Sequence, residues 1–332
     1  MNTPHKNRIV KIIVWIVGVI ILIAALLVVV AFFWPATSKQ LQSSNSEKLN
    51  YNQSIAAAIR TINGDSSNTD VRPECRSIIK THGQKTAKAV LMIHGVSACP
   101  QQFVELGDTF FKAGYNVYIP RVPSHGLTDN KRHGEITIPA MAQFMNSSTS
   151  IISGLGEETG VIGLSGGANM ATWIAQYNSA TISRALLLSP FYQPSASEMP
   201  AWQSPLLRNL YGRDILPDSF SAGSNLSYRA LGKYMIIAKN YKSDFKATGL
   251  KHIGVVTSEN DTSIDMNLAT NIPQQIATAS NAKFQSYSIP ASFGIGHDIV
   301  ALSQDEVKKH VNKLYPFYLE MYEGKDVKLE SN

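Results

Sequence analysis

Runs of apolar residues alternate with amphipathic stretches along most of the chain beyond residue 88. The apolar runs predict strands at residues 89–93, 115–119, 161–164, 185–188, 253–256 and 284–289. Amphipathic stretches predict helices at residues 103–113, 138–155, 168–177 and 306–322. Strands that are apolar throughout are typical of a parallel sheet buried on both faces. The alternation therefore predicts an α/β domain at residues 89–332 with a mostly parallel, doubly wound sheet.

One stretch, from about residue 190 to residue 251, breaks this alternation. It is rich in Pro, Trp, Tyr and Leu, and Trp202, Leu206 and Leu207 would leave apolar surface in need of a partner. An insertion of this kind between sheet elements is a natural cap over a site. We expect a cap insertion here, and an ordinary surface excursion is the alternative.

The chain begins with a long apolar segment. Residues 12–34 contain no charged residue over 23 positions, enough to cross a hydrocarbon core of about 30 Å as a helix. A cleaved signal peptide has a shorter apolar region followed by a small-x-small site, and no convincing site follows this one. Lys6, Arg8 and Lys11 predict that residues 1–11 stay in the cytoplasm. We expect a single-pass membrane anchor with an extracytoplasmic domain, and removal of the segment as a signal stays open.

Residues 35–88 connect this predicted anchor to the domain. The stretch from Ser38 to Asp70 is rich in Ser, Asn and Gln, with one short helical patch at residues 55–62. This composition predicts a stalk that lifts the domain off the membrane, followed by a lead-in to the first strand.

Composition limits the classes of function. The chain has 332 residues, 44% of them hydrophobic, which suits one large α/β domain and excludes a largely disordered chain. The net charge of +6 is modest, and no dense basic cluster with interleaved aromatic residues is present. Nucleic-acid binding therefore gains no support.

The two cysteines fit an exported domain. Cys75 and Cys99 are an even pair, and an oxidising compartment permits a disulfide between them. Closing that short loop would contribute about 3 kcal/mol to stability. Two buried free thiols are the alternative.

A pentapeptide behind one predicted strand carries the strongest chemical signal. Gly163 to Gly167 reads G-x-S-x-G and follows the apolar run of residues 160–162. A sharp strand-to-helix turn would expose the hydroxyl of Ser165 at the top of the sheet, as a nucleophile requires. Gly163 and Gly167 would allow strand and helix to close together without a Cβ clash. A purely structural turn is the alternative.

A serine nucleophile needs a base that a carboxylate orients, and on such a sheet both follow the serine. His297 stands in a Gly-rich loop after the last predicted strand and is the expected base. His252 and His310 are expected to be structural or solvated. Asp261 follows the strand at 253–256 and is the expected acid. The alternatives are Asp265, a candidate helix cap, and Asp298, which is too close in sequence to the histidine.

Acyl transfer also needs donors for an oxyanion. The backbone N–H of Gly166, directly after the nucleophile, is one expected donor. The other is the N–H of Val96, in the loop after the strand at 89–93. His94 in that loop is expected to brace it by hydrogen bonding, with a role as proton carrier as the alternative. A bridge from Cys99 to Cys75 would hold the same loop.

Together these residues resemble those of the α/β-hydrolase superfamily, close to its monoacylglycerol lipase, carboxylesterase and serine aminopeptidase-like branches. The matching residues lie within residues 89–322 and are His94 to Val96, Pro120 to Gly126, Gly163 to Gly167, Asp261, Gly296 and His297. The resemblance implies the α/β-hydrolase fold, a Ser-His-Asp triad and half of an oxyanion hole from the first segment. Ser124 stands where many relatives have glycine. No motif implies a metal, a nicotinamide or a flavin, so no cofactor is expected.

The sequence thus predicts a membrane-anchored, extracytoplasmic serine hydrolase that cleaves carboxylic esters through an acyl-enzyme. An apolar cap and a membrane location favour a small-molecule substrate with a lipid-like acyl chain. A serine aminopeptidase-like peptidase on the same fold is one alternative, because one scaffold hosts many substrates. A catalytically silent surface binding module is the other.

Overall fold

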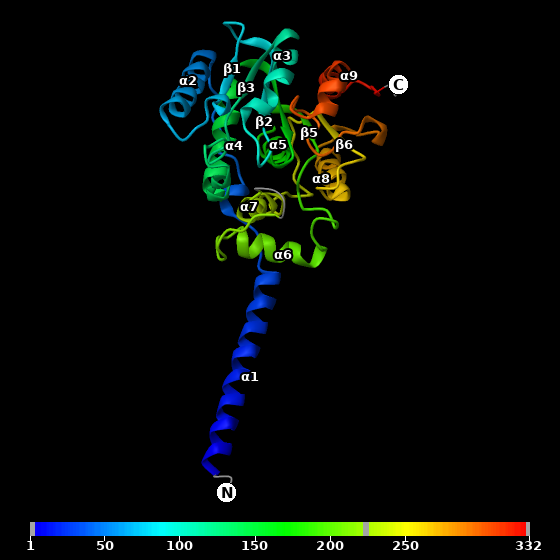
Figure 1. Cartoon of the computed structure of the whole chain (residues 1–332). Coiled ribbons are helices and arrows are strands. Elements are labelled where there is room, and N and C mark those ends of the chain that lie inside the picture. Colours follow the sequence, from blue (N-terminus) through cyan, green and yellow to red (C-terminus); the bar gives the residue numbers. More distant parts are fainter. Residues whose placement is uncertain (1–3, 222–225, 330–332) are drawn as a thin grey trace.

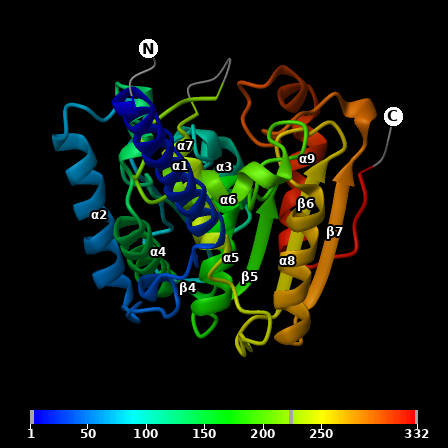
Figure 2. The same ribbon diagram turned by 90° about the horizontal axis from the view of Figure 1, so that it is seen from below.

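Seven strands form a single sheet in the computed structural model, which describes residues 4–221 and 226–329. The spatial order is β1-β3-β2-β4-β5-β6-β7. The strands are β1 (Ile78–Lys80), β2 (Thr86–Ile93), β3 (Tyr115–Ile119), β4 (Gly156–Leu164), β5 (Ile182–Leu188), β6 (His252–Ser258) and β7 (Lys283–Ile289). β1 runs antiparallel to β3, and all other neighbours are parallel. Figure 2 shows β4 to β7 side by side.

Helices cover both faces of this sheet. Along β2, Val90 and Met92 point into the core shared with α3 (Val104–Lys112) and α9 (Asp305–Glu323). Leu91 and Ile93 point into the opposite core, shared with α4 (Ile138–Ser153), α5 (Gly166–Tyr177) and α8 (Met266–Ala279). Successive side chains of a strand alternate between faces, so an unbroken apolar run fills both cores. The predicted doubly wound α/β fold is confirmed.

Residues 35–88 do not form an extended stalk. Tyr51–Ser67 is a helix, α2, that begins with a reciprocal cap between Asn50 and Gln53 and packs on α4. Leu41 and Ala58 are fully buried, and the indole N–H of Trp173 donates to the Leu41 carbonyl oxygen at 2.8 Å. These contacts contradict the predicted stalk. The polar residues of this stretch are used in caps and in hydrogen bonds to α4 rather than in solvation.

The helix α1 (Pro4–Phe33) extends away from the rest of the molecule (Figure 1). Its part Arg8–Phe33 has 26 residues and contains an 18-residue window with a mean hydropathy of 3.4, no residue of which is buried. At about 1.5 Å per residue this length exceeds the ~30 Å of a bilayer core. By length and composition α1 could span a membrane, as a signal sequence also could.

The stretch between β5 and β6 contains short helical elements. They are η5 (Ala201–Gln203), α6 (Ser204–Leu206), the π-helical turn η6 (Leu207–Tyr211) and α7 (Tyr228–Ala238). α7 packs on α5, whereas α6 and η6 contact α1. Figure 1 shows these elements at the end of the molecule from which α1 leaves. We call residues 190–251 the cap segment.

A disulfide joins Cys75 to Cys99, with the two Cα atoms 5.1 Å apart. Cys75 ends the short helical turn η2 (Pro73–Cys75), and Cys99 directly precedes η3 (Pro100–Phe103). Gly126, at a φ of 66°, lies against the bridge, and a Cβ there would stand 2.6 Å from the Cys75 Cβ. The disulfide therefore connects the lead-in to the loop after β2, and the loop at Gly126 packs against the bridge.

We predict that the double variant Cys75→Ser, Cys99→Ser unfolds about 6–10 °C below the wild type, because the reduced chain regains about 3 kcal/mol of loop entropy. Calorimetry of the full chain in detergent measures the shift, and reduction of the wild type should reproduce it. An unchanged melting temperature, with two free thiols in the mass of the untreated protein, would contradict the bridge.

Candidate active site

Ser165 occupies the sharp turn between β4 and α5. Its φ of 55° and ψ of −118° lie outside the regions that non-glycine residues favour. The turn is held because the Ser165 N–H donates to the Leu188 carbonyl oxygen at 2.9 Å, and the Phe191 N–H donates to the Ser165 carbonyl oxygen at 3.1 Å. A Cβ on Gly163 would meet the backbone of Gly167, so strand and helix close only with glycine there.

Asp261 and His297 follow β6 and β7 and meet in a hydrogen bond. His297 Nδ1 lies 2.7 Å from Asp261 Oδ2, and the Ser263 N–H donates to Oδ1 at 2.8 Å. A carboxylate only accepts, so Nδ1 carries the proton and Nε2 is left as an acceptor. The Asp261 side chain is fully buried, whereas that of His297 is 28% exposed. The Asp261 carboxylate is therefore shielded from solvent, whereas the His297 ring is accessible.

The other candidate acids have separate partners. Asp265 caps α8 by accepting from the Leu268 N–H at 3.0 Å. Asp298 Oδ1 accepts from the N–H groups of Val300 and Ala301, both at 3.0 Å. Neither carboxylate forms a hydrogen bond or ion pair with His297 in the described residues, so the structure gives both of them other partners.

The other two candidate histidines lie in structural settings. His252, at the first position of β6, contacts Gln285 at 2.9 Å, and burial lowers its pKa to about 4. His310, on α9, packs on the ring of Phe293 with centroids 4.6 Å apart. Neither lines the cavity that contains Ser165.

Ser165 and His297 line one cavity of about 480 Å³, within the range of small-molecule sites. Its wall is part apolar and part polar, and the cap segment contributes the apolar side chains of Phe191, Met199 and Leu231. Glu198 adds a carboxylate from the same segment. No hydrogen bond joins the Ser165 hydroxyl to His297 among the described residues. Catalytic hydrogen bonds are often long or poorly aligned before a substrate binds.

The loop after β2 lies directly against the serine. A Cβ on Gly95 would stand 3.6 Å from the Ser165 Cβ, and one on Gly166 would stand 2.5 Å from Val96 Cγ2. The Gly166 N–H opens α5 and has no acceptor within the helix. Neither it nor the Val96 N–H donates to another group in the described part of the chain. Two free N–H groups therefore lie beside the serine.

His94 braces this loop. The Val122 N–H donates to His94 Nε2 at 3.0 Å, and Nδ1 donates to the Gly95 carbonyl oxygen at 2.9 Å. Burial lowers the pKa of His94 to about 4, so its ring is neutral near neutral pH. Both ring nitrogens are occupied, which leaves none to carry a proton for catalysis. The interpretation of His94 as a brace fits this geometry better than that of a proton carrier.

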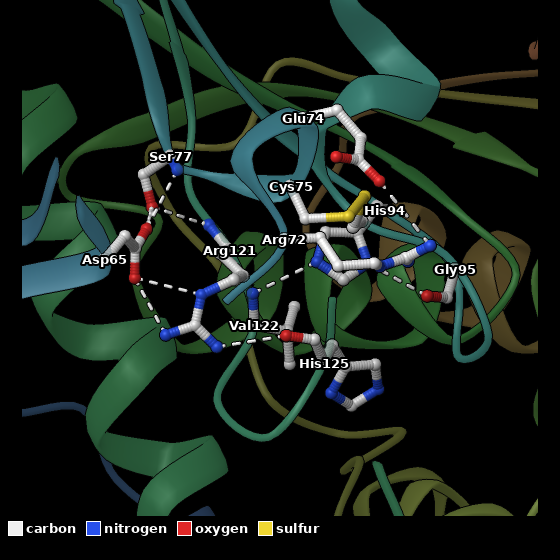
Figure 3. Close-up of a disulfide and its surroundings, with 11 residues drawn as sticks. Asp65, Arg72, Glu74, Cys75, Ser77, His94, Gly95, Arg121, Val122 and His125 are labelled. Atoms are coloured by element: carbon white, nitrogen blue, oxygen red, sulfur yellow. Dashed lines mark hydrogen bonds and ion pairs between the residues drawn. A yellow bond between two sulfur atoms is a disulfide. The ribbon is translucent and has the colours of Figure 1, made fainter. Parts of the chain in front are cut away.

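A buried ion pair supports the same region from α2 (Figure 3). Arg121 Nη2 lies 2.7 Å from Asp65, and Nη1 donates to the His125 carbonyl oxygen at 3.0 Å. Ser124, which lies between Arg121 and His125 in the sequence, has a φ of 64°. Serine thus takes the left-handed conformation that glycine adopts more readily.

Gln102 joins the loops after β2 and β7, and the sequence did not predict this role. Its Oε1 accepts from the Gly95 N–H at 2.9 Å, and its Nε2 donates to Asp298 Oδ2 at 2.8 Å. Asp298 directly follows His297, so one side chain connects the loop after β2 to the loop after β7. No local sequence pattern distinguishes Gln102 from its neighbour Gln101.

The described residues contain no group of three or more His, Cys, Asp or Glu side chains arranged to hold a metal ion. The side chains around Ser165 can perform nucleophilic attack with proton transfer, in a cavity whose wall is part apolar and part polar.

Comparisons with known proteins agree with this architecture. Residues 84–244 match the family model described as "Serine aminopeptidase, S33". No curated protein matches the chain in sequence.

Several solved structures share the fold at low sequence identity. A soluble variant of monoglyceride lipase from Saccharomyces cerevisiae, in complex with a substrate analog, is 14% identical with a TM-score of 0.56, over 76% of this chain and 92% of that one. Monoacylglycerol lipase from Paleococcus ferrophilus is 15% identical with a TM-score of 0.53, over 74% and 99%. A thermostable carboxyl esterase from Bacillus coagulans is 14% identical with a TM-score of 0.53, over 74% and 94%. Taken with the sheet order, these likenesses show that the chain has the α/β-hydrolase fold.

Proposed function

We propose that the protein is a serine hydrolase that cleaves carboxylic esters through an acyl-enzyme. One observation carries the proposal: the 2.7 Å contact between His297 and Asp261 presents a histidine to the cavity that holds Ser165 on a strained turn. Strain of this kind persists only where the surroundings enforce it, and it concentrates at functional sites.

The proposed reaction has two halves. His297 Nε2 takes the proton of the Ser165 hydroxyl as the oxygen attacks the ester carbonyl carbon, and the N–H groups of Val96 and Gly166 stabilise the resulting oxyanion. The alcohol leaves with the proton from His297, and the acyl group stays on Ser165. A water molecule, deprotonated by His297, then attacks the acyl carbon, and His297 returns the proton to the Ser165 oxygen as the acid leaves. Asp261 holds the imidazole in the required tautomer and stabilises its positive form.

The apolar part of the cavity wall supports a lipid-like acyl group as the substrate. Phe191, Met199 and Leu231 offer dispersion contacts and apolar area to a hydrocarbon chain. Two of the similar solved structures are of lipases that act on monoglycerides by name, and one is of a carboxyl esterase.

Peptide cleavage is the second candidate. Glu198 lines the same cavity and could receive the cationic amino terminus of a short peptide. The family model that matches residues 84–244 bears the name of a serine aminopeptidase.

We further propose that α1 is a single-pass anchor with the N-terminus in the cytoplasm and the catalytic domain outside it. The 26-residue apolar helix and the cations before it support this orientation. The disulfide supports an oxidising compartment for the domain.

Replacing the nucleophile gives the direct test of mechanism. We expect Ser165→Ala to lower kcat for a p-nitrophenyl ester by at least about 10³-fold, because no other hydroxyl replaces it on the turn. Ser303→Ala, an exposed serine, is the matched control and should keep wild-type turnover. Equal turnover by Ser165→Ala and wild type would remove the catalytic proposal and favour a silent binding module.

A substrate panel separates the two candidate activities. We expect kcat/KM for medium-chain p-nitrophenyl esters to exceed that for aminoacyl p-nitroanilides, with Glu198→Gln leaving ester cleavage within about twofold, because a neutral ester makes no ion pair. Preferred cleavage of the anilides, lost in Glu198→Gln, would instead establish the peptidase.

Gln102 gives a test of positioning. We predict that Gln102→Ala lowers kcat about tenfold with little change in KM, because the loops after β2 and β7 lose their shared hydrogen bonds while the apolar side chains of the cavity wall stay in place. Gln101→Ala, at the exposed neighbouring position, is the control. Steady-state kinetics measures both values, and a change in KM alone would contradict the positioning role.

A further inference from the structure

Side chains of the cap segment contact the end of α1 and the residues that follow it. Asn209, on η6, is fully buried, and its Nδ2 donates to the carbonyl oxygens of Ala31 at 2.8 Å and Trp34 at 3.1 Å. The guanidinium of Arg213 donates to the Pro35 carbonyl oxygen and stacks over the Trp34 ring, 4.7 Å from its centroid. Figure 1 shows α1 leaving the molecule at this point, beside α6. These contacts set the position of the cap segment relative to α1.

Given the membrane anchoring proposed above, on which this inference rests, the surface around η6 lies at the level of the lipid headgroups. Large apolar side chains are exposed on the elements that flank the contact: Trp202 is 61% exposed, Ile215 is 51% and Trp34 is 41%. Tryptophan is the residue type enriched at the boundary between membrane and water. At the level of the headgroups these side chains would contact lipid, which explains their exposure on the protein surface.

Three cations gather on the same surface. Arg208 and Arg213 belong to η6 and the turn after it, and Lys239 directly follows α7. Within residues 4–221 and 226–329, none of them forms an ion pair with a carboxylate, and the Nε of Arg213 is buried without a partner. Asp214, the nearest carboxylate in sequence, pairs with Lys233 and lies 3.5 Å from Arg229.

The cations are close enough to affect one another. The pKa of Arg208 is lowered by burial and then by the charge of Arg213. The pKa of Lys239 is lowered by burial and then by the charge of Arg208. Three like charges with no protein counterion are an arrangement that an external anion would stabilise.

We propose that Arg208, Arg213 and Lys239 bind the phosphate of an anionic phospholipid headgroup in the leaflet from which α1 emerges. Guanidinium groups match phosphate oxygens in a two-point geometry, and cations beside a membrane span are attracted to anionic lipid. The anchor and the exposed tryptophans beside the cluster favour a lipid phosphate over a soluble one. Binding holds the cap segment, and with it part of the cavity wall, against the bilayer.

The test uses the full chain in nanodiscs of phosphatidylcholine, with or without phosphatidylglycerol. Hydrogen–deuterium exchange of residues 200–216 reports contact between the cap segment and the lipid. We expect slower exchange in the anionic discs, by roughly fivefold for each contacting cation. Glycerol 3-phosphate added to the phosphatidylcholine discs should give no such protection. Protection by this soluble phosphate would overturn the assignment to lipid.

Two double variants sharpen the result. Arg208→Gln with Lys239→Gln should abolish most of the difference between the two disc types, while Arg213 is kept because it also holds Trp34. Lys112→Gln with Lys308→Gln removes equal charge from exposed positions on α3 and α9 and should leave the difference unchanged. Equal exchange in both disc types, or an unchanged difference in the first variant, would refute the headgroup site. Failure of the chain to enter nanodiscs would instead refute the anchor.

Discussion

The site depends on the close approach of β4 to α5 at Ser165. The turn is tight enough that a side chain on Gly163 would meet the backbone of Gly167, and Ser165 is left with a φ of 55°. The hydrogen bond that Ser165 donates to the end of β5 and the one that it accepts from Phe191 hold it there. Because parallel strands end at one edge of the sheet, the loops after β2, β6 and β7 reach the same point. The position of Ser165 on the strained turn therefore determines which residues of these loops lie close enough to form a site with it.

The N-terminal part of the chain belongs to this arrangement. Asp65 on α2 pairs with Arg121, which supports the loop beside His94, and the disulfide ties η2 to the start of η3. The cap segment lines the cavity and also contacts α1. The same segment therefore connects the proposed catalytic cavity to the proposed membrane anchor, which suits a substrate that partitions into lipid.

Local sequence patterns were sufficient to predict the central sheet and the residues that lie around the cavity. The unbroken apolar run of β2 and the G-x-S-x-G turn are local signals, and strand order then places Asp261 near His297. Other features had a weak local signal or none. β1 has only three residues, and the sequence predicted α2 only as a short patch at residues 55–62, although the helix extends over Tyr51–Ser67 and packs on α4. Gln102 bonds to groups distant in sequence, so its role follows only from the folded chain.

The proposed chemistry requires the strained Ser165 to be the nucleophile. Reaction of the full chain with a fluorophosphonate, followed by intact-mass measurement and peptide mapping, would locate the reactive residue. We expect one adduct per chain, on Ser165, with loss of esterase activity in step with labelling. Labelling at another residue, or full activity retained by the labelled protein, would show that Ser165 is not the nucleophile.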